Sequence, residues 1–427
     1  MKFGFISLGC CKNLVDSEKM MGLLKSYEQE IVSDPQDADV IVVNTCGFIE
    51  SAKEESINTI LEMAEYGKKL IVTGCLAQRY LKELREEMQE VDCFIPLQDY
   101  DQFGSILSNL LGIQIPNEYG KTARLIATKP WVGYLKIADG CSNRCSYCAI
   151  PLIRGNYRSF KIEDLIEEAK TLLASGVKEL VVIAQDTTRY GEDLYGKRCL
   201  IELLRQLNEL HFHWIRVLYM YPDEIDEELI IGMKTLDRVL PYFDIPVQYG
   251  EDEMLKLMNR RGSVESILET IKTIRTHYAL PALRTTLIVG FPHETEETFE
   301  QTLSFMKVCK WDRLGAFTYS KEEDTPAYTM DHEVSEADAE RRLKQIMDLQ
   351  ESIVVDRMQA LVGETLEVLV ENYDGLTSRY LGRSIFSAPD GIDGLVYFRS
   401  DEKYEMGSFA NVKITKVDKH DLFGEVM

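Results

Sequence analysis

Three hydrophobic runs alternate with amphipathic stretches along the first part of the chain. They are rich in Val and Ile and nearly continuous: "FGFISLGC", "DADVIVVNTC" and "KKLIVTGC". Continuous apolar strands separated by helices are typical of a parallel sheet that is covered on both faces. The pattern therefore predicts an N-terminal parallel α/β domain over residues 1–118.

A second series of strand-like runs begins near Trp131 and again alternates with helical stretches. The strand candidates are "VGYLKIA", "KELVVIAQ", "WIRVLYM", "YFDIPVQ", "RTTLIVGF" and "RLGAFTYS". Six such strands predict a parallel barrel or an incomplete one, a partial (β/α)6 TIM-like barrel within residues 127–357. In this architecture the loops that follow the strands carry the active site.

The periodicity changes near Ser335. The stretch "SEADAERRLKQIMDLQESIVVDRMQALVG" has apolar residues near helical spacing and predicts one long amphipathic helix. Short alternating runs follow, namely "TLEVLVE", "GLVYF" and "FANVKITKV". They predict a small C-terminal antiparallel β-barrel, OB-like in character, over residues 360–427. The expected fold class is thus α/β, with three domains.

The charge balance restricts the kinds of partner. The 427 residues contain 48 Lys and Arg against 71 Asp and Glu, a formal net charge of −23. Nucleic-acid binders neutralise phosphates and usually present a basic surface, so the overall charge argues against direct tRNA binding. Acidic side chains also outnumber basic ones within 360–427, and electrostatics therefore favours a basic macromolecular partner.

The sequence shows no membrane or export signal. No run is long and apolar enough to span a bilayer, and the opening residues "MKFGFISLGCC" do not resemble a signal peptide. We therefore expect a cytoplasmic protein without a membrane partner. In a reducing compartment, cysteines serve more often as metal ligands, catalytic groups or small buried residues than in disulfides. The packed-residue interpretation suits Cys93, Cys199 and Cys309, which have no partner at motif spacing.

Three other cysteines, Cys10, Cys46 and Cys75, each end one of the N-terminal hydrophobic runs. Parallel strands end at the same edge of a sheet, and ligands gather at that edge. One cysteine at a strand end would mean little, but three at equivalent positions predict a shared metal site. At the first strand either Cys10 or Cys11 could supply the thiolate.

A compact cysteine group follows the first strand of the second series. In "DGCSNRCSYCAIPLIRG" the spacing is Cys-x3-Cys-x2-Cys, formed by Cys141, Cys145 and Cys148. A structural zinc site needs four nitrogen or sulfur ligands, usually in two pairs, and no fourth ligand lies nearby, so zinc is the second choice. Cysteines normally hold every iron of a cubane cluster, and three of them leave one iron open to a small molecule. We therefore favour an iron–sulfur cluster.

This spacing, with Tyr147 just before Cys148, resembles the radical S-adenosylmethionine (radical SAM) superfamily. The resemblance implies a 4Fe-4S cluster whose open iron is chelated by S-adenosyl-L-methionine. It also implies that one electron from the cluster cleaves the sulfonium and yields a 5′-deoxyadenosyl radical. Residues 127–357 would then be the radical SAM core.

Four residues are candidates to contact the cofactor: Tyr147, Arg154, Gln185 and Gly290. Gln185 and Gly290 end strands of the second series, although a loop-ordering amide and close strand packing would also explain them. Arg154, together with Arg158, follows the cysteine loop and could hold a carboxylate in bidentate fashion, with a solvated loop as the alternative.

The order of an N-terminal three-cysteine domain, a radical SAM core and a small β-domain resembles the methylthiotransferase family over essentially the whole chain. The motifs are "SLGCCKN", "NTCGF", "TGCLAQ", "CSNRCSYCAIP", the Arg154-Gly155 pair and "IVGFP", with a tail like the domains called TRAM. The resemblance implies two 4Fe-4S clusters. Cys10, Cys46 and Cys75 would hold the auxiliary one, and Cys11, where proline is common, is not assigned as a ligand.

"CSNRCSYCAIP" and "SAPDGIDGLVYF" are similar to the branch that modifies a ribosomal protein. That branch implies addition of a methylthio group to the β-carbon of an aspartate in small-subunit ribosomal protein number twelve, free or in the subunit. We also expect a reducing electron donor such as flavodoxin or ferredoxin. Phe160, Tyr249 and His293 depart from residues that are usual in the family. The alternatives are a tRNA 2-methylthio-N6-isopentenyladenosine methylthiotransferase and a non-enzymatic iron–sulfur or zinc scaffold or electron carrier.

Overall fold

The structure is a computed structural model that describes residues 1–389, 391 and 393–427. Asp390 and Ile392, two positions of the run "SAPDGIDGLVYF", lie outside the described residues. The chain divides into two compact units. The first unit comprises Met1–Gly176, Ile183–Gln185 and Ser320–Tyr328, and the second comprises Val177–Val182, Asp186–Tyr319 and Thr329–Met427.

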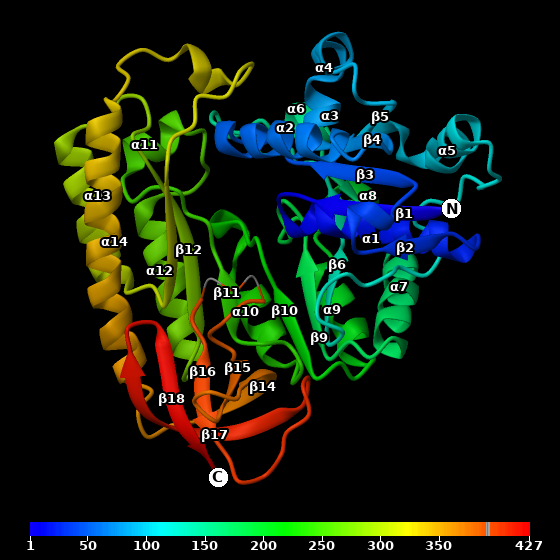
Figure 1. Ribbon diagram of the computed structural model, residues 1–427. Helices are drawn as coiled ribbons and strands as arrows, with labels where there is room; N and C mark the ends of the chain where they lie inside the picture. Colours follow the sequence, from blue (N-terminus) through cyan, green and yellow to red (C-terminus); the bar gives the residue numbers. More distant parts are fainter. Residues whose placement is uncertain (390, 392) are drawn as a thin grey trace. The chain divides into compact units, whose positions relative to one another are not determined.

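The first unit contains a five-stranded parallel sheet in the order β2-β1-β3-β4-β5 (Figure 1). Its strands are β1 (Lys2–Ser7), β2 (Glu30–Val32), β3 (Val40–Thr45), β4 (Lys69–Gly74) and β5 (Cys93–Pro96). Its helices are α1 (Cys11–Ser26), α2 (Glu50–Ala64), α3 (Cys75–Arg79), α4 (Leu81–Glu87) and α5 (Phe103–Leu111). The predicted parallel α/β fold of this region is confirmed.

The central strand β3 shows why the sheet forms. Val40 and Val42 point into one core, with Phe3 and Phe103. Ile41 faces a second core on the other side of the sheet. Each of these side chains is fully buried, which contributes about 1.5–3 kcal/mol per residue. A continuous apolar run is needed because both faces of the strand are covered.

The first unit also holds the elements around the compact cysteine group. They are β6 (Val132–Lys136), β7 (Ala138–Asp139), α6 (Ile150–Arg154), β8 (Arg158–Ser159) and α7 (Ile162–Ala174). β7 and β8 pair in an antiparallel way on either side of the cysteine loop. The loop therefore starts and ends on paired strands, which holds its two ends together.

The second unit contains the later strands of the predicted series. β9 (Glu179–Ile183) pairs in parallel with β10 (Trp214–Val217), and β11 (Tyr242–Asp244), β12 (Ala282–Val289) and β13 (Arg313–Thr318) form another parallel sheet. Its helices are α8 (Glu192–Tyr195), α9 (Leu200–Asn208), α10 (Glu227–Lys234), α11 (Asp252–Leu257), α12 (Val264–His277), α13 (Glu296–Cys309) and α14 (Glu336–Gln359). The predicted long helix is α14, which packs against β12 and β13 (Figure 1).

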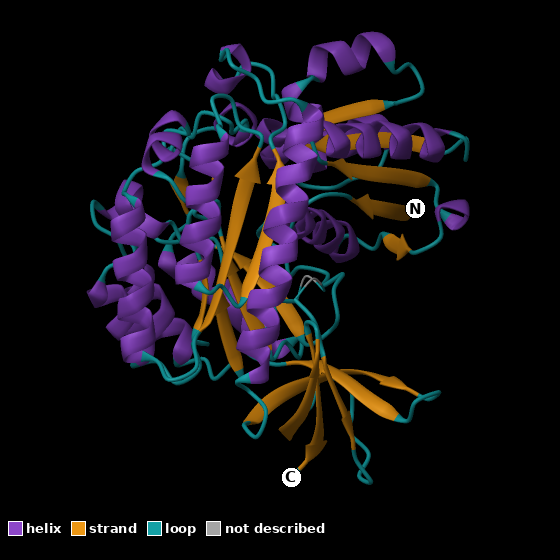
Figure 2. Cartoon of the chain, turned by 90° about the vertical axis from the view of Figure 1, so that its left-hand side faces the viewer, coloured by secondary structure: helices purple, strands orange, loops and turns teal. Residues whose placement is uncertain are grey.

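The chain ends in a closed five-stranded barrel, with the C-terminus at the end of its last strand (Figure 2). The strands are β14 (Thr365–Asp374), β15 (Arg379–Arg383), β16 (Val396–Arg399), β17 (Phe409–Asp418) and β18 (Asp421–Val426). The prediction of a small barrel is confirmed, but the expectation that it is antiparallel throughout is wrong, since β16 and β18 run parallel. A closed ring with an odd number of strands cannot alternate in direction at every pairing.

Short 3-10 helices are η1 (Pro35–Asp37), η2 (Leu97–Gln102), η3 (Pro222–Glu224) and η4 (Pro326–Thr329). Among the described residues, no helix combines the length and the apolar character that a membrane crossing requires.

Candidate functional site

The first cysteine group consists of Cys10, Cys46 and Cys75 and lies at one edge of the five-stranded sheet. β1, β3 and β4 are adjacent parallel strands, and the last residues of β3 and β4, Thr45 and Gly74, are in register. Cys46 and Cys75 directly follow these two strands, and Cys10 lies three residues beyond β1, at the N-terminus of α1. The structure therefore brings the three cysteines together as predicted, and their role as ligands stays a prediction.

Glycines beside these cysteines allow the three turns to touch. Gly9 has φ +83°, and a Cβ on it would lie 2.8 Å from Cys46 Cβ. A Cβ on Gly47 would lie 2.8 Å from the backbone of Leu76, the residue after Cys75. Glycine at these positions thus lets each cysteine-bearing turn lie against the next one. A larger residue at Gly9 or Gly47 would force the two turns apart.

Asn13 connects the turns through its side chain and was not singled out from the sequence. This buried amide donates from Nδ2 to the carbonyl oxygens of Leu8 (3.1 Å) and Thr45 (2.9 Å). Its Oδ1 accepts from Cys75 Sγ (3.4 Å) and from Arg154 Nη2 (2.6 Å). The only signal in the sequence was its place in "SLGCCKN", one helical turn after Cys10.

Arg154 lies at the centre of a buried charge network. Its guanidinium, 2% exposed, donates to both carboxylate oxygens of Asp139 (3.0 and 3.1 Å) and to Asp16 Oδ2 (3.0 Å). Lys136 also pairs with Asp16 and Asp139. Burial alone would raise the pKa of Asp139, but Lys136 and Arg154 hold it well below its usual range. The network links α1 of the sheet domain to Asp139, two residues before Cys141.

These contacts differ from the expected role of Arg154 as a partner of a cofactor carboxylate. The guanidinium is already bound to two protein carboxylates, whereas Arg158 is exposed. A cofactor contact by Arg154 stays untested, and its geometry favours a role beside the first cysteine group.

Charge sets the three thiols apart. Cys10 is exposed, yet desolvation by the surrounding protein is the largest single effect on its pKa and raises it. Lys12, Arg154 and the backbone N–H groups of Asn13 and Lys12 together outweigh this and leave the pKa of Cys10 below its ordinary value. Burial raises the pKa of Cys46 and raises that of Cys75 to about 12, although Arg154 acts in the opposite direction on both.

The second cysteine group, Cys141, Cys145 and Cys148, occupies the loop between β7 and α6. Cys141 N–H donates to the carbonyl of Gly155 (3.1 Å), and Cys148 N–H donates to the carbonyl of Cys145 (3.1 Å). Gly140 has φ +73°, and a Cβ there would lie 2.2 Å from the Asn156 carbonyl oxygen. Contacts within the segment from Gly140 to Asn156 therefore shape this loop.

Neither cysteine group has the geometry of ligands to one shared ion. Among the described residues, the three sulfurs of neither group all lie within 4.8 Å of one another. A single zinc ion needs its ligands close together, because each lies only about 2.3 Å from the metal. The cysteines of an iron–sulfur cluster bind different irons and are spaced more widely. The donor sets fit clusters better than single ions.

The remaining cofactor candidates have contrasting surroundings. The side-chain oxygen of Gln185 is buried and accepts no hydrogen bond from the described residues, as a ligand-binding group would in the absence of its ligand. Tyr147 is half-buried. Gly290 has φ +73°, and a Cβ on it would lie 2.6 Å from Ala339 Cβ on α14, so close packing accounts for this glycine. All three assignments stay predictions, and Gly290 belongs to the second unit.

The segment Ser320–Tyr328 adds residues that sequence reasoning missed. Glu322 is 2% exposed and accepts from Arg79 Nη1 (2.7 Å), with Lys53 Nζ at 3.4 Å. Arg79, on the helix that Cys75 begins, also donates to the carbonyl of Gly47 (3.1 Å). Further along, Ala327 N–H donates to the carbonyl of Ser146 (2.8 Å) in the second cysteine loop. This segment therefore binds Arg79, on the helix that begins at Cys75, and Ser146, within the second cysteine loop.

Comparison with known families defines the class first. A model described as "Uncharacterized protein family UPF0004" matches residues 2–96, the radical SAM superfamily model matches 135–306, and a TRAM domain model matches 362–427. Among solved structures, the radical S-adenosylmethionine methyltransferase TsrM from Kitasatospora setae shares 12% identity with a TM-score of 0.56, covering 74% of this chain and 72% of its own. OxsB, a cobalamin-dependent S-adenosylmethionine radical enzyme, has a TM-score of 0.52 at 12% identity, covering 82% and 56%. These structures support the fold alone.

Curated relatives narrow the class to one family. "Ribosomal protein uS12 methylthiotransferase RimO" of Acetivibrio thermocellus is 47% identical over 100% of this chain and 98% of its own. The proteins of the same name from Clostridioides difficile and Caldicellulosiruptor saccharolyticus are 47% and 46% identical, each over the whole chain. The chain belongs to the ribosomal protein uS12 methylthiotransferase family of radical SAM enzymes.

Proposed function

We propose that this protein is a radical SAM methylthiotransferase that adds a methylthio group to the β-carbon of an aspartate in small-subunit ribosomal protein number twelve. The observation that carries the proposal is the pair of three-cysteine groups in the first unit, one at the sheet edge and one in the loop before α6. Relatives named for this activity are 46–47% identical over the whole chain, which supports the same substrate.

Two 4Fe-4S clusters and S-adenosyl-L-methionine are the proposed cofactors. Cys141, Cys145 and Cys148 would hold the cluster with an open iron, and Cys10, Cys46 and Cys75 would hold the auxiliary one. When bound, the cluster of the second cysteine group would supply the electron that cleaves S-adenosyl-L-methionine, and the auxiliary cluster would supply the site of sulfur transfer. Tyr147, Gln185 and Gly290 are the proposed cofactor contacts, of which the orphaned amide oxygen of Gln185 has the best support.

The protein's own groups prepare the thiolates. A cysteine must lose its proton to bind a metal, and burial opposes this for Cys46 and Cys75. The guanidinium of Arg154 favours the thiolate form of all three residues of the first group. Asn13 fixes the position of Arg154 relative to Cys75 by bonding both.

The macromolecular partner is proposed to be basic. A net charge of −23 attracts a strongly basic ribosomal protein and repels a polyanion, so direct tRNA binding is not part of the proposal. We propose residues 1–118 as the auxiliary-cluster domain, 127–357 as the radical SAM core and 360–427 as the substrate-binding domain. A low-potential electron donor such as flavodoxin or ferredoxin and a cytoplasmic location complete the proposal.

A competition assay tests this function. Anaerobically reconstituted protein with reductant, S-adenosyl-L-methionine and sulfide receives both the ribosomal protein, free or in the small subunit, and isopentenylated tRNA. We expect mass spectrometry to find one methylthio group on an aspartate of the ribosomal protein, and none with the Cys141→Ala variant. Methylthio addition to the tRNA alone would refute the proposed substrate while keeping the chemistry.

A further inference from the structure

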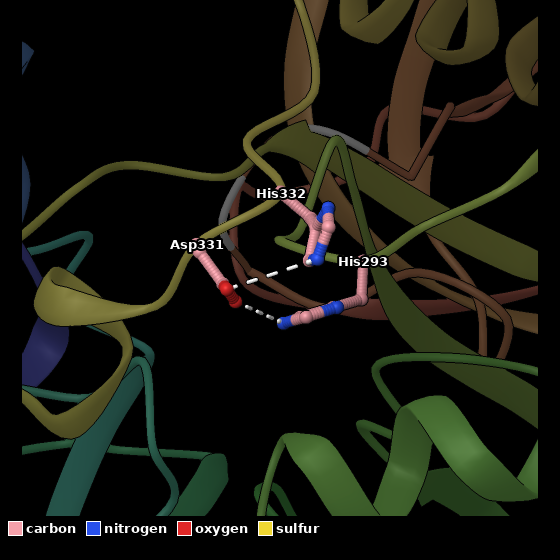
Figure 3. A group of neighbouring side chains, drawn as sticks. All are labelled: His293, Asp331 and His332. Atoms are coloured by element: carbon pink, nitrogen blue, oxygen red, sulfur yellow. Dashed lines mark ion pairs between the residues drawn. The ribbon is translucent and has the colours of Figure 1, made fainter.

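Two histidines and an aspartate of the second unit converge on one another, and none of them belongs to either cysteine group. His293 lies in the loop between β12 and α13, and Asp331 and His332 lie in the segment before α14 (Figure 3). His293 Nε2 is 3.0 Å from Asp331 Oδ1, and His332 Nε2 is 3.7 Å from Asp331 Oδ2. One ligand atom from each residue lies within 4.8 Å of the other two.

These distances suit ligands of one small cation. Zinc binds imidazole nitrogen and carboxylate oxygen at about 2.0–2.2 Å, which places neighbouring ligand atoms of a tetrahedral site about 3.3 Å apart. The distance from His293 Nε2 to Asp331 Oδ1 is close to this value, and His332 Nε2 lies 3.7 Å from the other oxygen of the same carboxylate. Both imidazoles present Nε2 toward the same carboxylate, and three protein ligands leave a fourth position for water.

The backbone holds the two loops in this arrangement independently of the side chains. His293 N–H donates to the carbonyl of His332 (3.0 Å), and the two imidazole rings lie 4.7 Å apart between centroids. Both histidines have positive φ, +69° and +55°, a conformation that non-glycine residues seldom adopt. Residues held in such conformations concentrate at functional and ligand-binding positions.

We propose that His293, Asp331 and His332 form a binding site for a borderline divalent cation, with Zn²⁺ as the ion to test. Imidazole ligands favour zinc and its transition-metal neighbours, whereas magnesium and calcium prefer oxygen ligands. The side chains are 34%, 81% and 71% exposed, so the ion exchanges with solvent rather than being buried as a folding element. The site goes beyond the proposed function and uses no residue of either cysteine group.

Occupancy of this site acts on the loop that contains Gly290. Glu294, next to His293, is buried and accepts from Gly290 N–H and from Tyr249 Oη (2.8 Å). A cation that joins His293 to Asp331 and His332 therefore fastens the loop after β12 to the segment before α14. Zinc should reduce amide hydrogen exchange in both segments.

Zinc binding to the cluster-loaded full chain tests the site. The clusters occupy the six cysteines of the two groups, and a chelating zinc indicator under anaerobic conditions then measures the remaining sites. We expect wild-type protein to bind one more zinc ion per chain than the His293→Gly variant. We also expect His332→Ala and Asp331→Asn to weaken that binding by at least about tenfold. Glycine accepts the φ of +69° at position 293, so His293→Gly removes a ligand without straining the loop.

His277→Ala is the matched control, because His277 also pairs with a carboxylate, Glu227 (3.2 Å), but belongs to no three-ligand group among the described residues. This variant should bind zinc as the wild type does. Equal zinc stoichiometry and affinity in wild type and His293→Gly, with both proteins folded by circular dichroism, would overturn the proposal and leave an ion pair only. Zinc-dependent exchange protection that persists in His293→Gly would overturn it as well.

Discussion

The two cysteine groups reach a similar composition by opposite routes. Cys141, Cys145 and Cys148 share one loop of the continuous segment between β7 and β8, and contacts such as Cys141 N–H to the Gly155 carbonyl close that segment. Cys10, Cys46 and Cys75 come from three turns that are distant in sequence and meet only because β1, β3 and β4 are adjacent in the sheet. The sheet-edge group, Cys10, Cys46 and Cys75, thus depends on the whole sheet domain. The loop group depends mainly on one continuous segment.

This difference teaches how the same ligand type is controlled in two ways. The sheet-edge thiols are set among Asn13, Lys12 and Arg154, which act on their pKa values. In the loop group, the close spacing in sequence and the contacts within one continuous segment bring the cysteines together. Damage to the sheet should therefore remove one set of ligands and leave the other.

The largest effect is expected from removing a ligand in either group. Cys141→Ala should reduce 5′-deoxyadenosine formation to background, because two thiolates do not hold the radical-generating cluster. Cys46→Ala should keep that reaction but lose methylthio transfer to the ribosomal protein. Product analysis by mass spectrometry with iron and sulfide content distinguishes them. Loss of both activities in both variants would show that the groups do not work separately.

Two glycine substitutions should separate the groups without touching a cysteine. A Cβ on Gly74 would lie 2.3 Å from Asn44 Oδ1, and one on Gly140 would lie 2.2 Å from the Asn156 carbonyl oxygen, both at positive φ. In each variant the backbone strain and the close contact together should lower the free energy of unfolding by roughly 2–6 kcal/mol. Gly74→Ala should lower cluster content at the first group only, and Gly140→Ala at the second only. Gly67→Ala is the control, since a Cβ there meets nothing within 4 Å.

Arg154→Gln should impair the first group more than the second. Removing this buried cation leaves Lys136 as the remaining cation paired with Asp16 and Asp139 and should destabilise the protein by about 3 kcal/mol. The pKa values of Cys10 and Cys75 should rise, so the first group should take up iron more slowly at neutral pH and recover at higher pH. Arg158→Gln, on the exposed neighbour, should change neither denaturant midpoint nor loading rate.

A smaller effect is expected at Glu322, which joins the segment Ser320–Tyr328 to Arg79 and Lys53. Glu322→Gln keeps the size of the side chain but removes the charge that pairs with Arg79 and Lys53. It should lower the free energy of unfolding by about 2 kcal/mol. Because Arg79 also holds the Gly47 carbonyl, methylthio transfer should fall more than 5′-deoxyadenosine formation. Glu323→Gln, which removes only the charge of an exposed carboxylate that accepts from Tyr80 Oη, serves as the control. An equal loss in both assays would contradict the link to the first group.

The smallest effect is expected from Cys11→Ala. Cys11 begins α1 and is not assigned to either group, so iron content, methylthio transfer and stability should stay within about 1 kcal/mol or twofold of wild type. Loss of iron in Cys11→Ala together with normal iron content in Cys10→Ala would mean that Cys11, not Cys10, supplies the thiolate.

Much of the fold could be predicted because apolar runs and turn residues act over short distances. β3, β12 and α14 lie where the periodicity placed them, and the continuous burial of β3 matches its central place in a parallel sheet. The parallel pair β16–β18 could not be predicted, because it follows from closure of the ring rather than from any one strand. Asn13 and Glu322 were missed for a related reason, since their partners are remote in sequence.

The sequence by itself determined the cysteine spacing, the strand runs that end at Cys46 and Cys75, and the acidic charge, which together pointed to the family. Only the tertiary structure decided that Arg154 pairs with Asp16 and Asp139, and that His293 meets His332. Local patterns follow from periodicity and backbone sterics, which act between near neighbours. Contacts between distant side chains depend on how whole elements pack, and no short stretch of sequence contains that information.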